Sequence, residues 1–320
     1  MTLIGHDNAW RAWRDAMTSS RMHHAWILAG LKGVGKGLFA RAAAAELVRE
    51  AGIPQPDPAN HPDIIVLDHL PANEKEEENK AEGKPYAVKR NITIDQIRRM
   101  QARLNTRPTL GSRRAVIIDP ADSLETASCN ALLKSLEEPP AGTFFLLVTH
   151  RPGRLLPTIR SRCRTLRFDP LPADAIERIL RAEAPDASTA TRAAAIAAAE
   201  GSPGAALEFV AQDLGTLHTL MVRILAEGDH AFTLRGALAD EIGARPDRER
   251  QLAVCDLARA VIAAQLPLGD RTQQARVIAA HGELVRLAAQ LPTYNFDPAL
   301  VAMEIGGLLA SAAMPREAAY

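Results

Sequence analysis

An octapeptide that begins at Gly30, GLKGVGKG, matches all but the last position of the pattern G-x-x-x-x-G-K-[ST]. Such a loop binds phosphate because glycines let backbone amides converge on phosphate oxygens at the N-terminus of a helix, and Gly33 and Gly35 meet that need. Lys36 stands where a lysine reaches the β and γ phosphates, but Gly37 replaces the hydroxyl residue that binds Mg²⁺. The loop therefore predicts a degenerate nucleotide site without its protein ligand for the metal.

A second departure follows the apolar run RRAVIID, which resembles a Walker B strand ending in Asp119. In such strands the aspartate orients Mg²⁺, and a glutamate that activates water often follows, but Pro120 stands there. Without that carboxylate, general-base assistance of about 10²- to 10⁴-fold is lost. Considered alone, Asp119 could equally be a strand-end cap or turn residue. Together with Gly37, the pattern predicts a chain that needs no cofactor of its own, and weak residual nucleotide binding stays open.

Residues 151–167 form an arginine segment with no acidic residue before Asp169. Its six arginines are Arg151, Arg154, Arg160, Arg162, Arg164 and Arg167. The planar, always charged guanidinium suits phosphate better than an ammonium group does, and across a subunit boundary it can stabilise the charge of phosphoryl transfer. A solvated basic edge or intramolecular ion pairs would explain the same composition.

The elements expected around these motifs alternate between apolar runs and helical stretches. Strands are predicted at 25–30, 62–68, 114–119 and 143–149, with helices at 36–50 and 94–104 and within the stretch 129–140. This alternation indicates an α/β domain with a parallel sheet, whose central strands at 114–119 and 143–149 are continuously apolar. The last helix should stop at Glu138, because Pro139 disfavours helical backbone before it.

The remainder of the chain is predicted to be helical. Residues 73–84 are a mixed charge run that we interpret as a solvated loop, with a segment that binds a partner as the alternative. After residues 166–172, strand signals end and alanine-rich helical periodicity continues, broken by turn formers. We therefore predict an α/β domain over 1–168, a small helical domain over 169–210 and a larger helical domain over 211–320.

Composition restricts the possible partners. The 320 residues carry 38 basic and 38 acidic side chains, so attraction to DNA would need a local basic patch. Residues 88–118 offer one, which could face DNA or a neighbouring protein, with Asp95 as its only acidic residue. Its cations are Lys89, Arg90, Arg98, Arg99, Arg103, Arg107, Arg113 and Arg114. The three cysteines lie too far apart in sequence for a zinc motif, no run is apolar enough to span a membrane, and the first residues lack a signal-peptide pattern, so we expect a cytoplasmic protein without a metal site.

The motifs HHAWILAGLKGVGKG, NALLKSLEEPP, FFLLVTHRPGRLLPTIRSRCR and EGSPGAAL together resemble the AAA+ clamp-loader family of bacterial DNA polymerase III. The similarity covers residues 1 to about 210, and the part from Asn130 to Arg164 is the most specific. The resemblance implies an AAA+ module of the P-loop type, a small helical lid, and a C-terminal helical collar through which subunits assemble into a ring.

The resemblance also implies roles for individual residues. Ser161, Arg162 and Cys163 match the family's S-R-C sequence, in which the arginine acts in trans on ATP held by an adjacent motor subunit. Gly204 stands where the family has its sensor 2 arginine. Four zinc-binding cysteines that many related subunits carry after the P-loop helix are missing from this sequence.

The predicted function is therefore a non-hydrolysing clamp-loader subunit that supplies an arginine finger to a neighbouring ATPase. The implied partners are motor subunits of the gamma/tau kind, the delta subunit, the sliding clamp, and primer-template DNA through the assembled complex. The main alternative is an ATP-hydrolysing motor subunit of the gamma/tau kind. A P-loop phosphotransferase or a scaffold AAA+ protein without clamp contacts are further alternatives.

Overall fold

The computed structural model describes residues 3–19, 21–266, 270–291, 293–294 and 296–313. It divides the chain into two compact units, Met1–Pro170 and Leu171–Tyr320, and each is described by itself. Among the described residues, none of the helices is long and apolar enough to cross a membrane. The predicted division of the helical part at residue 210 stays a prediction.

The first unit is built on a parallel five-stranded sheet with the order β2-β3-β4-β1-β5. Its strands are β1 (Ala25–Gly30), β2 (Ile64–Leu67), β3 (Arg114–Ile118), β4 (Thr143–Thr149) and β5 (Arg164–Phe168). The continuously apolar runs β3 and β4 are inner strands, as predicted, because both of their faces are covered. The α/β fold class with a parallel sheet is confirmed.

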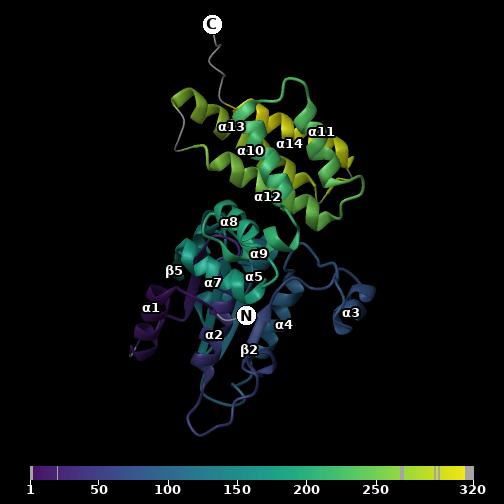
Figure 1. The fold of residues 1–320 in the computed structure, drawn as a ribbon. Helices are drawn as coiled ribbons and strands as arrows, with labels where there is room; N and C mark the ends of the chain where they lie inside the picture. The colour runs from purple at the N-terminus through teal and green to yellow at the C-terminus, as the bar shows by residue number, and fades with distance from the viewer. Residues whose placement is uncertain (1–2, 20, 267–269, 292, 295, 314–320) are drawn as a thin grey trace. The chain divides into compact units, whose positions relative to one another are not determined.

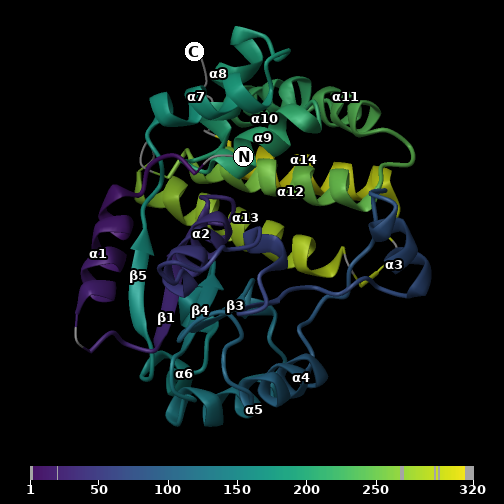
Figure 2. The same ribbon diagram turned by 90° about the horizontal axis from the view of Figure 1, so that it is seen from below.

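Helices cover both faces of this sheet, as Figure 2 shows, with α2 on one face and α4, α5 and α6 on the other. The helices of this unit are α1 (Asp7–Thr18), α2 (Lys36–Val48), α3 (Glu74–Ala81), α4 (Ile94–Leu104), α5 (Thr126–Glu137) and α6 (Pro157–Arg160). Three short 3₁₀ turns lie in connections between strands and helices: η1 (Pro58–Asn60), η2 (Ala121–Ser123) and η3 (Pro152–Arg154). Helix α5 ends as predicted, since Glu138 is its C-cap.

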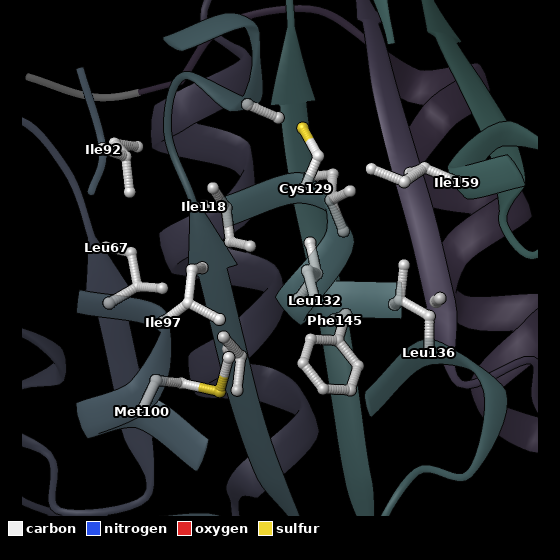
Figure 3. Packing of buried hydrophobic residues seen from close by; sticks show 14 of the residues in the cluster. Leu67, Ile92, Ile97, Met100, Ile118, Cys129, Leu132, Leu136, Phe145 and Ile159 are labelled. Atoms are coloured by element: carbon white, nitrogen blue, oxygen red, sulfur yellow. The ribbon is translucent and has the colours of Figure 1, made fainter. Parts of the chain in front are cut away.

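One hydrophobic cluster fixes α4, α5 and α6 to the sheet (Figure 3). Ile118 from β3 and Phe145 from β4 pack there with Leu132 and Leu136 of α5. Ile159 of α6 belongs to the same cluster and is fully buried. Because side chains of a strand alternate between faces, the neighbouring strand residues pack toward α2 instead.

Residues 73–84 are not the loop that their charge suggested, because residues 74–81 form helix α3. Asn73 caps its first turn by accepting a hydrogen bond from the amide of Glu76, and Glu76 in turn accepts one from the amide of Ala87 at 2.8 Å. Acidic residues in the first turn and Lys80 in the last match the helix dipole. The helix buries none of its residues, as the charge run suggested.

The second unit consists of helices, shown in Figure 1 from teal to yellow. They are α7 (Ala173–Glu183), α8 (Thr189–Ala198), α9 (Pro203–Ala211), α10 (Gly215–Glu227), α11 (Thr233–Ile242), α12 (Arg248–Ala263), α13 (Arg271–Gln290) and α14 (Pro298–Ala312). A strand-free C-terminal part was predicted, and the described residues of this unit contain no strand.

Candidate functional site

The glycine-rich loop joins the end of β1 to the start of α2, at the edge where the strands' carboxyl ends meet. Gly33 and Gly35 have φ angles of 77° and 106°, which favour glycine. Gly30 also needs to be glycine, because an added Cβ would lie 2.5 Å from the carbonyl oxygen of Phe168. The loop thus has the backbone of a phosphate-binding loop, and the predicted residues Gly30, Gly33 and Gly35 lie where the motif places them.

Lys36 points into its own loop. Its side chain is buried, and Nζ donates hydrogen bonds to the carbonyl oxygens of Gly30 at 2.9 Å and of Leu31 at 2.5 Å. Burial lowers the pKa of Lys36 to about 8, while the charges of Asp119 and Asp122 act in the opposite direction. The ammonium group that would bind phosphate is bound here to backbone carbonyls.

Gly37 lies against the side chains of Asp119 and Arg41. A Cβ added at Gly37 would be 2.5 Å from Oδ2 of Asp119 and 3.4 Å from Nη1 of Arg41. Nη1 of Arg41 lies 3.3 Å from that same Oδ2 and 3.3 Å from the carbonyl oxygen of Gly37. The space that a serine or threonine side chain would fill therefore already holds an ion pair.

These groups do not fit a magnesium-bound nucleotide. Mg²⁺ in a P-loop needs the hydroxyl that Gly37 lacks and the carboxylate of the Walker B strand. Asp119 carries that carboxylate, but Arg41 neutralises it. Sequence inspection identified Gly37 and Asp119 but missed Arg41, whose only signal was its place one helical turn after Gly37.

Asp122 is a further residue of this edge that the sequence analysis missed. Its carboxylate accepts hydrogen bonds from the hydroxyl of Thr149 and the amide of His150, both at 2.6 Å, and from the amide of Arg151 at 3.2 Å. The pKa of His150 is lowered by burial and by the charge of Lys36, with the two aspartates acting oppositely. Asp122 therefore fixes the end of β4 beside the P-loop.

Arg162 lies at the surface, two residues after the end of α6. Its side chain is 35% exposed, and Nη2 is 2.7 Å from Oε1 of Glu137. Nη1 donates to the carbonyl oxygen of Thr158 at 2.9 Å and to the hydroxyl of Ser161 at 3.4 Å. Within the described residues, these contacts come from α5 and from the α6 segment and none comes from the P-loop.

The residues on either side of Arg162 differ in surroundings. Ser161 donates its hydroxyl to Thr158 and accepts from Arg162, so it helps to orient the guanidinium. Cys163 packs against the hydrophobic cluster, and burial raises the pKa of its thiol to about 12. Of this trio, only Arg162 offers charge at the surface.

The other five arginines of the segment are exposed. Arg164 and Arg167 belong to β5, an edge strand, where charge discourages pairing with another strand. The guanidinium of Arg164 also lies 5.3 Å from the ring of Trp26. Composition alone could not distinguish Arg162 from the other five arginines. Its contacts with Glu137, Thr158 and Ser161 do distinguish it.

Arg114, counted with the basic stretch 88–118, does not face any partner. It is buried on β3, and Nη2 lies 3.6 Å from Oδ1 of Asp63. Its terminal nitrogens also donate to the carbonyl oxygens of Arg103, Thr106 and Arg107. The basic composition of residues 88–118 suggested a surface position for Arg114, because the sequence does not show that residues 103–107 fold over its side chain.

Within the described residues, no three His, Cys, Asp or Glu side chains are placed to hold a metal ion. Gly204, at the predicted sensor 2 position, lies in α9 of the second unit. The cytoplasmic location and the roles assigned to individual residues stay predictions.

The first unit has a parallel sheet with a glycine-rich loop after its first strand, and a helical unit follows it in the chain, which agrees with the predicted AAA+ module of the P-loop type. The model of the family described as "DNA polymerase III, delta subunit" matches residues 5–172, and the chain belongs to this family. The motifs resembled those of delta prime subunits in particular, and the comparisons confirm that resemblance.

Two curated relatives are DNA polymerase III subunits delta′. That of Pseudomonas aeruginosa is 34% identical over 209 residues, which is 60% of this chain and 58% of the relative. That of Escherichia coli is 32% identical over 200 residues, 59% of this chain and 55% of the relative. The matches thus span little more than half the length of these relatives. A tau subunit of Salmonella typhimurium is 30% identical over 254 residues, 76% of this chain and 38% of the relative.

Proposed function

We propose that this chain is a non-hydrolysing subunit of a DNA polymerase III clamp loader. It supplies Arg162 in trans to ATP bound by a neighbouring motor subunit of the gamma/tau kind. The assembly, which includes a delta subunit, places a sliding clamp on primer-template DNA. In this function the chain needs no cofactor of its own, and the helical unit serves as lid and collar.

The position of Arg162 carries this proposal. An arginine finger must reach beyond its own chain and keep a defined orientation, because its guanidinium stabilises charge that develops on the transferred phosphoryl group. Arg162 is partly exposed and is held by contacts from Glu137, Thr158 and Ser161. Such fingers raise hydrolysis by about 10³- to 10⁵-fold in other P-loop proteins.

The chain's own P-loop supports the non-hydrolysing part of the proposal. Arg41 pairs with Asp119, Gly37 offers no hydroxyl, and Lys36 is bound to loop carbonyls. Pro120 follows Asp119 where a general base would stand. Each departure would weaken magnesium-dependent hydrolysis by this chain, and all of them act at one site.

Reconstitution of the loader with Arg162→Ala tests this role. The measurement is clamp- and DNA-stimulated ATP hydrolysis by a complex whose assembly is checked by gel filtration. We expect hydrolysis at the neighbouring site to fall by about 10³-fold or more, which removes that site's share of the total turnover. Arg160→Ala, a loss of charge at an exposed position two residues away, is the matched control and should leave turnover unchanged. Unchanged turnover in an assembled Arg162→Ala complex would refute the trans role.

A motor subunit of the gamma/tau kind is the second candidate, favoured by the tau match over 76% of the chain. It requires magnesium-dependent binding and hydrolysis of ATP by the isolated chain. Equilibrium dialysis with labelled ATP, followed by phosphate release, separates the two functions. We expect phosphate release from ATP to be no faster with the isolated chain than in buffer without protein. Steady release by the isolated chain would favour a motor subunit of the gamma/tau kind.

A further inference from the structure

We infer that Glu137 is a positioning residue for Arg162. The inference rests on the proposed function of Arg162 as an arginine finger in trans. Glu137 is the last helical residue of α5, within the segment LEEPP whose motif the proposed function leaves without a role. Its carboxylate oxygen Oε1 lies 2.7 Å from Nη2 of Arg162.

Packing of neighbouring residues fixes the backbone at both residues of this ion pair. Leu136, beside Glu137, is buried in the hydrophobic cluster, and its carbonyl oxygen is 2.9 Å from Nε2 of His24. Ile159, three residues before Arg162, is buried in the same cluster, where Figure 3 labels both it and Leu136. The cluster therefore sets the distance between α5 and α6, and with it the place from which Glu137 holds the guanidinium.

The contacts leave part of the guanidinium available to a phosphate. Thr158 and Ser161 accept from Nη1, and Glu137 pairs with Nη2. Within the described part of the chain, Nε of Arg162 has no hydrogen-bond partner. A guanidinium has five N–H donors in a rigid fork, so a carboxylate on one side and phosphate oxygens on another can be bound together.

Glu137 is suited to orienting the finger rather than to blocking it. Both side chains are substantially exposed, with 35% of Arg162 and 48% of Glu137 accessible to water. Exposed pairs contribute a factor of about 1.5 to 5 to an equilibrium, which is far less than a finger contributes to phosphoryl transfer. A pair of that strength fixes one rotamer of a long side chain without competing seriously with a neighbour's phosphate.

The experiment uses reconstituted complexes and measures single-turnover ATP hydrolysis and ATP affinity separately. Glu137→Ala should lower the hydrolysis rate by about two- to fivefold and leave the affinity for ATP within about twofold, since the pair orients a group that acts in the transition state. Glu137→Asp, which keeps the charge on a shorter side chain, should recover part of the rate. Glu138→Ala removes an adjacent exposed carboxylate and should change neither quantity.

Combination with Arg162→Ala separates this inference from the function on which it rests. Glu137→Ala should have no further effect when Arg162 is already alanine, because a positioning residue acts only through the group that it holds. If Arg162→Ala lowers turnover but Glu137→Ala leaves the rate unchanged or raises it, the positioning role is overturned and the finger stands. An additive loss in the double variant would likewise overturn it. If Arg162→Ala itself has no effect in an assembled complex, the finger and the positioning role are both refuted.

Discussion

Arg41 and Asp119 form an ion pair at the start of α2, with Nη1 of Arg41 3.3 Å from Oδ2 of Asp119. Nη1 also lies 3.3 Å from the carbonyl oxygen of Gly37, in the first turn of the same helix. A guanidinium of the chain therefore neutralises the carboxylate that a metal ion would neutralise in a working P-loop. Because Gly37 has no side chain, the pair can form in direct contact with the helix backbone.

Replacement of Gly37 by alanine should not stabilise the protein, although alanine is favoured over glycine inside helices by about 1 kcal/mol. The added Cβ would lie 2.5 Å from Oδ2 of Asp119, so the ion pair must shift. We expect the free energy of unfolding of Gly37→Ala, measured by urea denaturation, to be equal to or below that of the wild type.

Gly282 in α13 provides the matched control for that measurement. A Cβ added there meets no heavy atom within 4 Å, so Gly282→Ala should raise the free energy of unfolding by about 0.5 to 1 kcal/mol. An equal gain for Gly37→Ala would show that Asp119 and Arg41 move aside at no cost, and the close contact at Gly37 would then have no role in excluding a side chain.

The departures at Gly37 and Pro120 were readable from the sequence, because they replace fixed positions of local motifs. The ion pair of Arg41 with Asp119 was not, because 78 residues separate them and only the folded sheet brings α2 into contact with β3. Helix α3 was mistaken for a loop because its charge outweighed a local signal, the cap at Asn73. Strands β1, β3 and β4 were predicted well because runs buried on both faces must be continuously apolar.

Arg114 was counted with a basic surface patch but is buried. Its burial leads to a prediction on stability. With 4% of its side chain exposed, it pairs with Asp63, whose side chain is 1% exposed. Removal of Arg114 leaves the buried carboxylate of Asp63 without its opposite charge, held only by the amides of Thr109 and Leu110. Arg114→Ala should therefore lower the free energy of unfolding by about 3 to 5 kcal/mol. Arg113→Ala, a neighbouring loss of charge, should change it by no more than about 0.5 kcal/mol. Similar values for the two variants in urea denaturation would contradict a structural role specific to Arg114.

Lys36 should make the stability depend on pH in the alkaline range. Its pKa is about 8 in the folded chain and 10.5 as the ordinary value, because burial disfavours the charged form. Between these values the unfolded chain binds more protons, so this contribution to stability rises with pH from about 8 to about 10.5 and is constant below. Urea denaturation at several pH values should show the rise for the wild type relative to Lys36→Met, in which this titration is absent. Parallel curves for the two proteins would contradict a lowered pKa.

The last prediction concerns recovery of magnesium-dependent nucleotide binding. Gly37→Ser restores the hydroxyl but leaves Arg41 near Asp119, where its charge opposes that of a metal ion. Gly37→Ser combined with Arg41→Ala removes that opposition and frees the Asp119 carboxylate. We expect magnesium to strengthen ATP binding by about tenfold in the double variant and by less than about twofold in the wild type and in either single variant. Equilibrium dialysis with labelled ATP, with and without magnesium, measures all four. If Gly37→Ser alone gains as much as the double variant, the missing hydroxyl is the whole defect and Arg41 has no part in it.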